Sequence, residues 1–138
     1  MKASELSVGD WVKALNYHDD GSPYIGQVDG IIKKHGTYYC VFGVREITVE
    51  IDKCEPIPIT AEILVKNNFK WDGMYAYLEI DDTSFVTWYK HEGIVRKHYE
   101  HRENKGIETI FQSSPGIVYV HQLQHTLRLC GIEKEIEI

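Results

Sequence analysis

The sequence predicts an α+β fold: a small SH3-like β-barrel followed by an antiparallel sheet with a short helix and a C-terminal helix. Three observations lead to this expectation. The first 58 residues hold several short apolar segments between turn residues, which is typical of a small barrel or a tightly curled sheet. A Pro-rich connector follows at 56–59, and residues 117–130 repeat apolar side chains with a helical period. We therefore expect two subdomains, residues 1–58 and 59–138.

Turn residues separate the strands that we expect in the first subdomain. Gly9-Asp10 is typical of a turn, and residues 18–23 are typical of a polar loop. Gly30 marks a bend or bulge within one strand. The expected strands cover residues 11–17, 26–32, 37–42 and 46–51.

The second subdomain begins in an extended connector, because Pro56 and Pro58 fix φ and keep their predecessors out of the helical region. Thr60 is a capping residue for a short helix over 60–69. Two apolar segments flank Asp81-Asp82-Thr83, which indicates a hairpin. Strands are expected over 74–80, 84–90, 93–96 and 107–111, with a polar loop over 98–105 and a tail over 131–138 that could form an edge strand.

Residues 117–130 are the clearest helix in the chain, and Gly131 is well placed to end it. At about 100° per residue, the side chains divide into two faces. The face expected to cover the second sheet holds Tyr119, Val120, Leu123, Thr126, Leu127 and Cys130, and the opposite, polar face holds His121, Gln124, His125 and Arg128.

The composition indicates a folded, soluble protein with an acidic balance. The hydrophobic content is 43%, the charged content is 26%, and the net charge is −6. Neither subdomain is basic, because the first carries six Lys and Arg against nine Asp and Glu and the second nine against twelve. We therefore expect neither nucleic acid nor a membrane as a partner. No segment approaches the roughly 20 apolar residues that a membrane-spanning helix needs.

The cysteines indicate a reducing compartment. Cys40, Cys54 and Cys130 are odd in number and lack a CxxC spacing, which favours reduced, buried thiols. The first residues lack the apolar run of a signal peptide, so we expect a cytoplasmic protein. The sequence has no Walker-type or dinucleotide-binding glycine loop, and we expect no cofactor.

Three blocks of the chain resemble small uncharacterised proteins carried by gut Bacteroidales and by their prophages and mobile elements. The blocks are residues 6–12 with 26–28, residues 56–69, and residues 119–125 with 131–133, so the resemblance covers most of the chain. It implies a protein of a phage or mobile element, and it implies no catalytic residue. The first block also resembles the opening of SH3-like barrels, a fold that serves peptides, nucleic acids and subunit contacts alike.

A histidine pair lies on the C-terminal helix. His121 and His125 are four residues apart, a spacing that lets two imidazoles reach one metal ion. No glutamate lies between them as in a zincin, and a third ligand would come from elsewhere, such as His98, His101 or Glu103. We favour the alternative of two polar-face histidines, one of them bonded to a backbone carbonyl, and expect no metal.

Aromatic and basic side chains gather in the second subdomain. Residues 90–105 hold five Lys and Arg, which either bind an anion, with an aromatic ring stacked on a base, or belong to a solvated hairpin of mixed charge. We favour the solvated hairpin, and keep the aromatic hairpin and this basic stretch as the candidate surface. The candidate ligand-binding residues are Tyr75, Tyr77, Trp88, Tyr89, Arg96, Lys97, Tyr99 and Arg102.

These patterns leave three functions open. The leading hypothesis is a non-enzymatic binding or adaptor protein that contacts a protein partner or another copy of itself. The second is a binder of an anionic small molecule, such as a phage protein that sequesters a nucleotide immune signal. The third is a metal-dependent enzyme that uses His121 and His125. We expect no enzyme, because the chain lacks a Gly-x-Ser-x-Gly motif and Cys130 lies on an apolar helix face.

Overall fold

The computed structural model describes residues 1–15, 17–43, 47–103 and 105–138. The backbone divides into two compact units, Met1–Ile57 and Pro58–Ile138, which we call the N-terminal and C-terminal units. The chain is mostly β-structure with two short α-helices, which agrees with an α+β class at this coarse level. None of the helices in the described part of the chain is long and apolar enough to cross a membrane.

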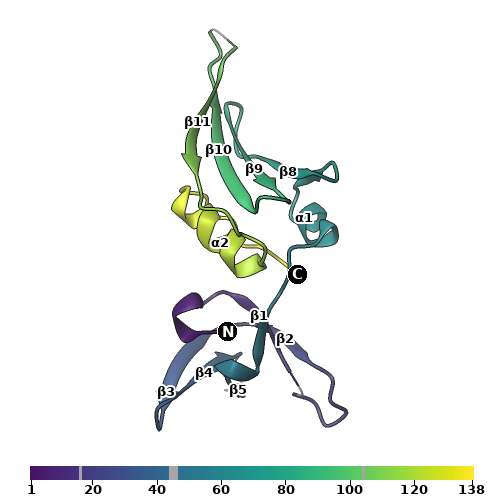
Figure 1. Cartoon of the computed structure of the whole chain (residues 1–138), viewed down its shortest axis with the longest axis vertical. Coiled ribbons are helices and arrows are strands. Elements are labelled where there is room, and N and C mark those ends of the chain that lie inside the picture. The colour runs from purple at the N-terminus through teal and green to yellow at the C-terminus, as the bar shows by residue number, and fades with distance from the viewer. Residues whose placement is uncertain (16, 44–46, 104) are drawn as a thin grey trace. The chain divides into compact units, whose positions relative to one another are not determined.

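The N-terminal unit consists of two three-stranded antiparallel sheets (Figure 1). One sheet has the order β2-β1-β6 and the other has the order β3-β4-β5, and the described residues do not close them into the expected barrel. Apolar side chains from both sheets form its core, with Val12, Val28, Cys40 and Phe42 almost fully buried. Its elements are η1 Ala3–Glu5, β1 Trp11–Ala14, β2 Tyr24–Gln27, β3 Gly30–Lys34, β4 Thr37–Phe42, β5 Ile47–Glu50, η2 Ile51–Lys53 and β6 Cys54–Pro56.

The strand expected over 26–32 is two strands that belong to different sheets. The chain leaves β2 after Gln27 and enters β3 at Gly30. Between them, the Val28 N–H donates to the Asp10 carbonyl at 2.7 Å, and the Asp29 N–H donates to the Val41 carbonyl at 2.8 Å. The continuous apolar pattern did not reveal this change of partner. The strand expected over 11–17 ends at Ala14, and Glu46 of the strand expected over 46–51 lies outside the described residues.

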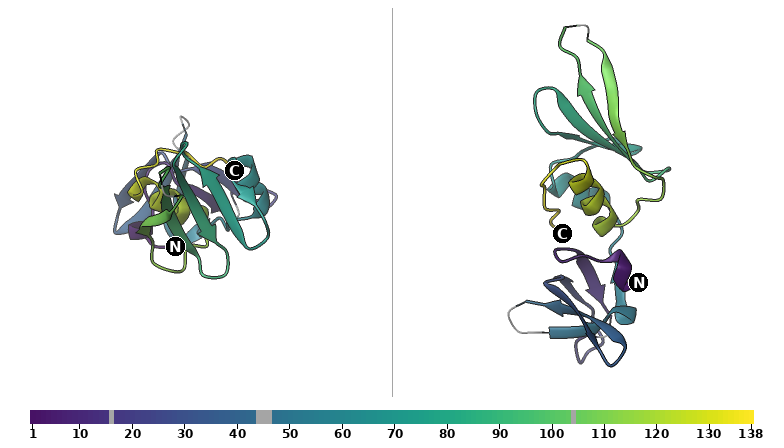
Figure 2. Two further views of the ribbon diagram at one scale, coloured as in Figure 1. Left: turned by 90° about the horizontal axis from the view of Figure 1, so that it is seen from above. Right: turned by 90° about the vertical axis from the view of Figure 1, so that its left-hand side faces the viewer.

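The C-terminal unit holds a five-stranded antiparallel sheet of order β11-β10-β9-β8-β7 and both α-helices. The ribbon places α1 and α2 together below the sheet in the view of Figure 1, and the β10–β11 hairpin extends away from α2. Figure 2 shows the same arrangement from two further directions. Its elements are α1 Ala61–Lys66, β7 Lys70–Trp71, β8 Tyr75–Glu79, β9 Ser84–Tyr89, β10 Ile94–Glu100, β11 Ile107–Gln112 and α2 Val120–Leu129.

Strand β10 is longer than the sequence indicated. A polar loop was expected to start at His98, but His98 pairs with Phe85 on β9 and with Thr109 on β11. The expectation was wrong because charged residues dominate this stretch, and its strand state comes from pairing with β9 and β11, which the local pattern does not show. The register shifts between Lys97 and His98, which marks a bulge against β11.

The short helix α1 forms where its cap predicts. Thr60 Oγ1 accepts a hydrogen bond from the Ile63 N–H at 3.3 Å, as an N-cap side chain should. The helix ends at Lys66 instead of continuing to Phe69, because Asn68 adopts a left-handed φ of 64°. Leu64 on its inner side is buried.

Helix α2 buries more of its surface than an amphipathic helix would. The apolar side chains expected to face inward are buried or half-buried, as predicted. His121 and Gln124, expected on the solvent face, are buried too. Part of the reason is the tail after Gly131, which does not form the expected edge strand but runs extended past Gln124.

Candidate functional site

The five-stranded sheet has two chemically different faces. Alternate residues point to opposite sides of a strand. The side chains of Val86, Trp88 and Val95 are buried on one face, where the Trp88 indole N–H donates to the Ile117 carbonyl at 2.8 Å. On the other face most side chains keep some solvent exposure around a buried histidine, and we call this the aromatic face. It consists of Tyr75, Tyr77, Phe85, Tyr89, Arg96 and His98.

The strand register brings the aromatic face together. Tyr75 lies opposite Tyr89, and Tyr77 lies opposite Thr87. On the next strand, Arg96 lies opposite Thr87 and continues the same row. Phe85 and His98 form a further cross-strand pair. Antiparallel pairing therefore places four aromatic rings from two strands beside one cationic side chain and one imidazole from a third.

The rings contact one another across the strands. The centroids of Tyr75 and Tyr89 are 6.0 Å apart, and those of Tyr77 and Phe85 are 5.0 Å apart. Both distances lie in the range of favourable aromatic pairs. Tyr75 is 40% exposed, and the other three rings are half-buried. The rings thus support one another while presenting their outer surfaces to solvent.

Arg96 is held in place by three neighbours. Its Nε donates to Gln112 Oε1 at 2.9 Å, and its guanidinium lies 4.0 Å from the Glu92 carboxylate. Its Cζ lies 4.8 Å from the centre of the Tyr89 ring, a cation–π geometry. The guanidinium is therefore oriented before any partner arrives.

His98 fills the centre of the aromatic face and is only 7% exposed. Its ring stacks on Phe85 with centroids 4.7 Å apart. Its Nε2 lies 3.0 Å from Thr87 Oγ1, and its Nδ1 lies 3.1 Å from Thr109 Oγ1. Burial, with the nearby charge of Arg96, lowers the pKa of His98. A neutral imidazole with both nitrogens bonded is suited to fixing the surface and not to proton transfer.

Lys70 borders the aromatic face on β7. Its Nζ lies 2.7 Å from Glu79 Oε1 and 5.6 Å from the centre of the Tyr77 ring. The carboxylate neutralises this lysine, and the Glu92 carboxylate lies beside the cation of Arg96. Each of the two cations at the aromatic face therefore has an acidic partner.

Two of the predicted ligand-binding residues lie on the opposite face of the sheet. Trp88 is 3% exposed, and its ring lies 6.1 Å from Trp71 beside a hollow of about 280 Å³ under the start of α1. Lys97 Nζ donates to the Cys130 carbonyl at the end of α2, at 2.8 Å. These two side chains fasten the helices to the sheet and do not join the tyrosines.

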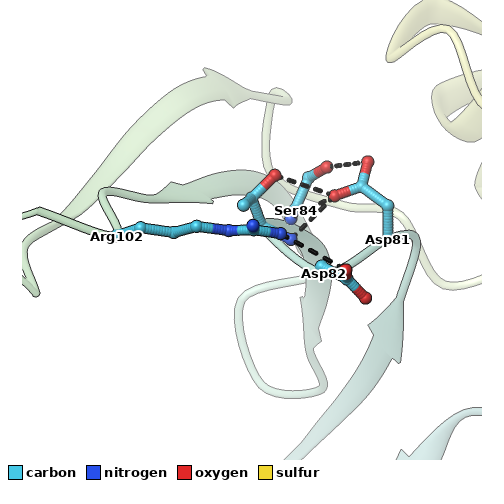
Figure 3. Close-up of polar contacts among 5 residues, drawn as sticks. Asp81, Asp82, Ser84 and Arg102 are labelled. Atoms are coloured by element: carbon cyan, nitrogen blue, oxygen red, sulfur yellow. Dashed lines mark hydrogen bonds and ion pairs between the residues drawn. The ribbon is translucent and has the colours of Figure 1, made fainter.

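Tyr99 and Arg102 lie apart from the aromatic face, toward the tip of the β10–β11 hairpin. They border a shallow, polar hollow of about 440 Å³ with Thr83, His101 and Glu103. The Arg102 guanidinium lies 3.3 Å from the Asp82 carboxylate, and both side chains are well exposed (Figure 3). The predicted composite site is therefore divided: Tyr75, Tyr77, Tyr89 and Arg96 lie together, Trp88 and Lys97 lie behind them, and Tyr99 and Arg102 lie at the tip.

Asp81 is committed to the turn between β8 and β9. Its carboxylate accepts hydrogen bonds from the hydroxyl and N–H of Ser84 and from the hydroxyl and N–H of Thr83 (Figure 3). These donors lower the pKa of Asp81 to about 2. The turn accounts for the role of Asp81, because both oxygens of its carboxylate already accept hydrogen bonds.

The two histidines of α2 lie close together, but the described residues do not complete a metal site around them. The ring centroids of His121 and His125 are 6.0 Å apart, and His121 is buried with its ring parallel to Tyr119. Within the residues that the structure describes, no group of three or more His, Cys, Asp and Glu side chains could hold a metal ion. His98, His101 and Glu103, considered as a third ligand, lie on or beyond β10.

The three cysteines are free thiols and are buried. The thiols of Cys40 and Cys54 interact in the N-terminal unit. A hydrogen bond with Cys54, together with burial, raises the pKa of Cys40. Burial raises the pKa of Cys130. The hydrogen bond between Cys40 and Cys54 lowers the pKa of Cys54. For Cys40 and Cys130, a raised pKa keeps the thiol protonated, which is the opposite of what a nucleophile requires.

Sequence reasoning missed Phe85 and His98 as members of the site. Alternation along β9 puts Phe85 on the same face as Tyr89, and this alternation was the available signal for its role. His98 was assigned to a loop, and without the β9–β10 register nothing connected it to Phe85. Lys70 was missed because β7 has only two residues and leaves no periodic pattern.

Comparisons with protein-family models, curated proteins and solved structures found no match to the chain. We therefore infer function from the side chains and their geometry.

Proposed function

We propose that the chain is a non-enzymatic binding protein, an adaptor of a phage or mobile element, that contacts a protein partner through the aromatic face. One observation carries this proposal: four aromatic rings on one sheet face retain solvent exposure beside a fixed guanidinium. A core would bury these rings, and a surface with no partner is seldom so rich in them.

The side-chain types support a protein partner. Tyrosine and arginine are enriched among the residues that dominate binding energy at protein interfaces. A tyrosine offers a large contact area and has few rotatable bonds, so ordering it costs little entropy. Cross-strand ring contacts and the bonds of Arg96 reduce that cost further.

The charge at the aromatic face favours protein over nucleic acid. Lys70 is paired with Glu79, and Arg96 lies near Glu92, so no excess of positive charge remains at this surface. Nucleic-acid binding draws on unpaired cations that replace counterions along the phosphate backbone. The net charge of −6 supports the same choice. Paired charges at the border of an apolar patch are typical of a protein interface rim.

We also propose that the N-terminal unit is SH3-like and that the protein acts in the bacterial cytoplasm. The chain passes from one three-stranded sheet to the other between Gln27 and Gly30, and a short 3₁₀ helix precedes the strand that returns to β1. This connectivity supports the SH3-like proposal. The free thiols support a reducing compartment. Solution NMR contacts between the two sheets test the fold, and an absence of contacts between β5 and the β2-β1-β6 sheet would argue against closure into a barrel.

Affinity capture from a Bacteroidales cell tests the binding function. The bait is the full chain, compared with a Tyr77→Ser, Tyr89→Ser variant and with the matched control Tyr38→Ser. Tyr38 is also an exposed tyrosine on a strand, but it lies in the N-terminal unit. We expect the wild type and the control to retain a protein that the double variant loses at least tenfold. Equal capture by all three baits contradicts the proposal, and capture of a second, differently tagged copy identifies self-association.

A binder of small anions is the second candidate function. Arg102, Tyr99 and His101 around the hairpin-tip hollow are the observation that favours it. A thermal-shift series with nucleotides tests it, because a ligand that binds only the folded state raises the melting temperature with its concentration. The expected rise disappears in Arg102→Ala. A melting temperature that no nucleotide changes in the wild type contradicts this second function and leaves the first one standing.

A further inference from the structure

The tail of the chain, residues 132–138, is an extended segment that packs on the C-terminal unit. The tail forms no strand. Alternate side chains face inward: Ile132 and Ile136 are buried, and Lys134 and Ile138 are half-buried. The three glutamates between them are exposed. The tail is therefore an extended segment with an apolar side and an acidic side.

Two side-chain amides hold the main chain of this tail. Gln124 Nε2 donates to the Lys134 carbonyl at 2.5 Å, and the Ile136 N–H donates to Gln124 Oε1 at 2.6 Å. Asn67 bonds Glu137 in the same reciprocal way, with its Nδ2 2.7 Å from the carbonyl and its Oδ1 2.9 Å from the N–H. Each amide thus offers the tail main chain one donor and one acceptor, as a neighbouring strand would, and Asn67 Nδ2 also donates to the Ile63 carbonyl at 2.8 Å. We call Asn67 and Gln124 the amide clamp.

The tail buries the amide clamp. With the tail in place, Asn67 and Gln124 are each only 3% exposed, so the tail main chain takes the place of water as the partner of their amide groups. Lys66 adds a third contact, because its Nζ donates to the Ile138 carbonyl at 2.6 Å. All of these bonds go to main-chain groups, while the two buried isoleucines supply the preference for sequence. The arrangement is that of an extended-peptide site, in which main-chain bonds give affinity and side-chain positions give specificity.

We propose that the amide clamp also binds residues 132–138 of a second copy of the chain. Gly131, with a φ of 75°, ends α2, and the Ile132 N–H donates to the Leu127 carbonyl at 2.9 Å, so redirecting the chain after Ile132 moves the rest of the tail while the helix end keeps its bonds. The tail belongs to no strand ladder, so its release breaks no sheet. A tail from a second copy restores every contact that the first copy gives up, which is the condition for exchange of a segment between protomers.

The protein concentration at which two chains exchange tails depends on how closely each tail is tethered to its own amide clamp. A tethered tail faces its own clamp at an effective concentration of about a millimolar. Because the contacts are identical within one chain and between chains, wild-type exchange is substantial only as the protein approaches that concentration. Blocking the internal contact should reveal the contact between chains at much lower concentrations.

A mixing experiment with two complementary defects tests the proposal. Ile136→Asp damages the tail and leaves the clamp intact, whereas Gln124→Ala damages the clamp and leaves the tail intact. Each variant alone should be a monomer at tens of micromolar by size-exclusion chromatography with light scattering. Their mixture should contain a complex with the mass of two chains, because only the mixture offers an intact clamp to an intact tail. A mixture that stays monomeric overturns the proposal.

A labelled peptide of residues 131–138 provides the second measurement. Fluorescence anisotropy should show at least tenfold tighter binding to Ile136→Asp than to the wild type, whose own tail competes, and than to Gln124→Ala. A peptide with the isoleucines and glutamates exchanged should not bind. Should Ile136→Asp fail to fold, Glu137→Pro takes its place, because it removes the Glu137 N–H that donates to Asn67 Oδ1 and keeps Ile136. Equal peptide affinity for the wild type, a folded tail variant and the clamp variant contradicts the proposal.

Discussion

The two faces of the five-stranded sheet differ in what their side chains do. On the helix side, Val86, Trp88 and Val95 are almost fully buried, and Trp88 and Lys97 hydrogen-bond the backbone at the two ends of α2. On the aromatic face, rings of similar size remain partly exposed. Hydrophobic side chains contribute to folding in proportion to the area they bury, so the helix side stabilises the unit. Substitutions on the aromatic face should lower the free energy of unfolding less, so the side chains of this face are available to bind a partner.

The largest expected effect comes from truncating the helix side. Trp88→Ala removes a buried ring and the hydrogen bond to Ile117, and we expect it to lower the free energy of unfolding by about 3–5 kcal/mol. Urea denaturation followed by circular dichroism measures this change. A loss below about 1 kcal/mol would show that the helix side is not the core of this unit.

The matching change on the aromatic face should be much smaller. Tyr77→Ala loses cross-strand contacts with Phe85 and a cation–π contact with Lys70, which together contribute about 1 kcal/mol. The same denaturation experiment compares it directly with Trp88→Ala. If the two substitutions destabilise equally, the aromatic face is a second core, and its proposed availability for binding fails.

The pH dependence of the free energy of unfolding tests whether His98 is buried within the aromatic face. Its pKa is lowered in the folded state, so below the ordinary value near 6.5 the unfolded chain takes up a proton that the folded chain does not. The contribution of His98 is therefore complete above pH 6.5 and is lost as the pH falls through that value toward the folded-state pKa. His98→Gln, which can still bond Thr87 and Thr109, should flatten the stability profile between pH 7.5 and pH 5. An unchanged profile would mean that the imidazole is not buried as described.

The smallest effect is expected at the hairpin tip. Arg102→Ala removes an exposed ion pair with Asp82, and such pairs contribute little in water. We expect a change in unfolding free energy below about 0.5 kcal/mol. A larger loss would indicate that the tip hollow is a rigid, organised site, and would favour the small-anion function over the protein-binding one.

The sequence predicted those features that depend on neighbours along the chain. The strand over Thr37–Phe42 formed as expected, because alternation and a turn define it locally. Thr60 caps α1, and Gly131 follows the end of α2, for the same reason. Alternation along β8 likewise puts Tyr75 and Tyr77 on one face of that strand.

Features that depend on pairing between distant segments were not predictable. The strand state of His98 depends on β9 and β11, and the burial of the Trp88 face, as opposed to the Tyr89 face, depends on where α2 packs. Gln124 was assigned to solvent because helical periodicity does not include a tail that folds back and bonds its amide. In each case a partner far along the chain determines the environment of the side chain.

Site-specific photo-crosslinking tests most directly whether the aromatic face is a protein-binding surface. A photoreactive phenylalanine analogue replaces Tyr77 in the full chain, expressed in a Bacteroidales cell, and a control chain carries it at Leu129, which is 76% exposed on α2. We predict one discrete crosslinked protein, which mass spectrometry identifies, from position 77 and none from position 129. No adduct from position 77, or the same adducts from both positions, would contradict the proposed role of the aromatic face.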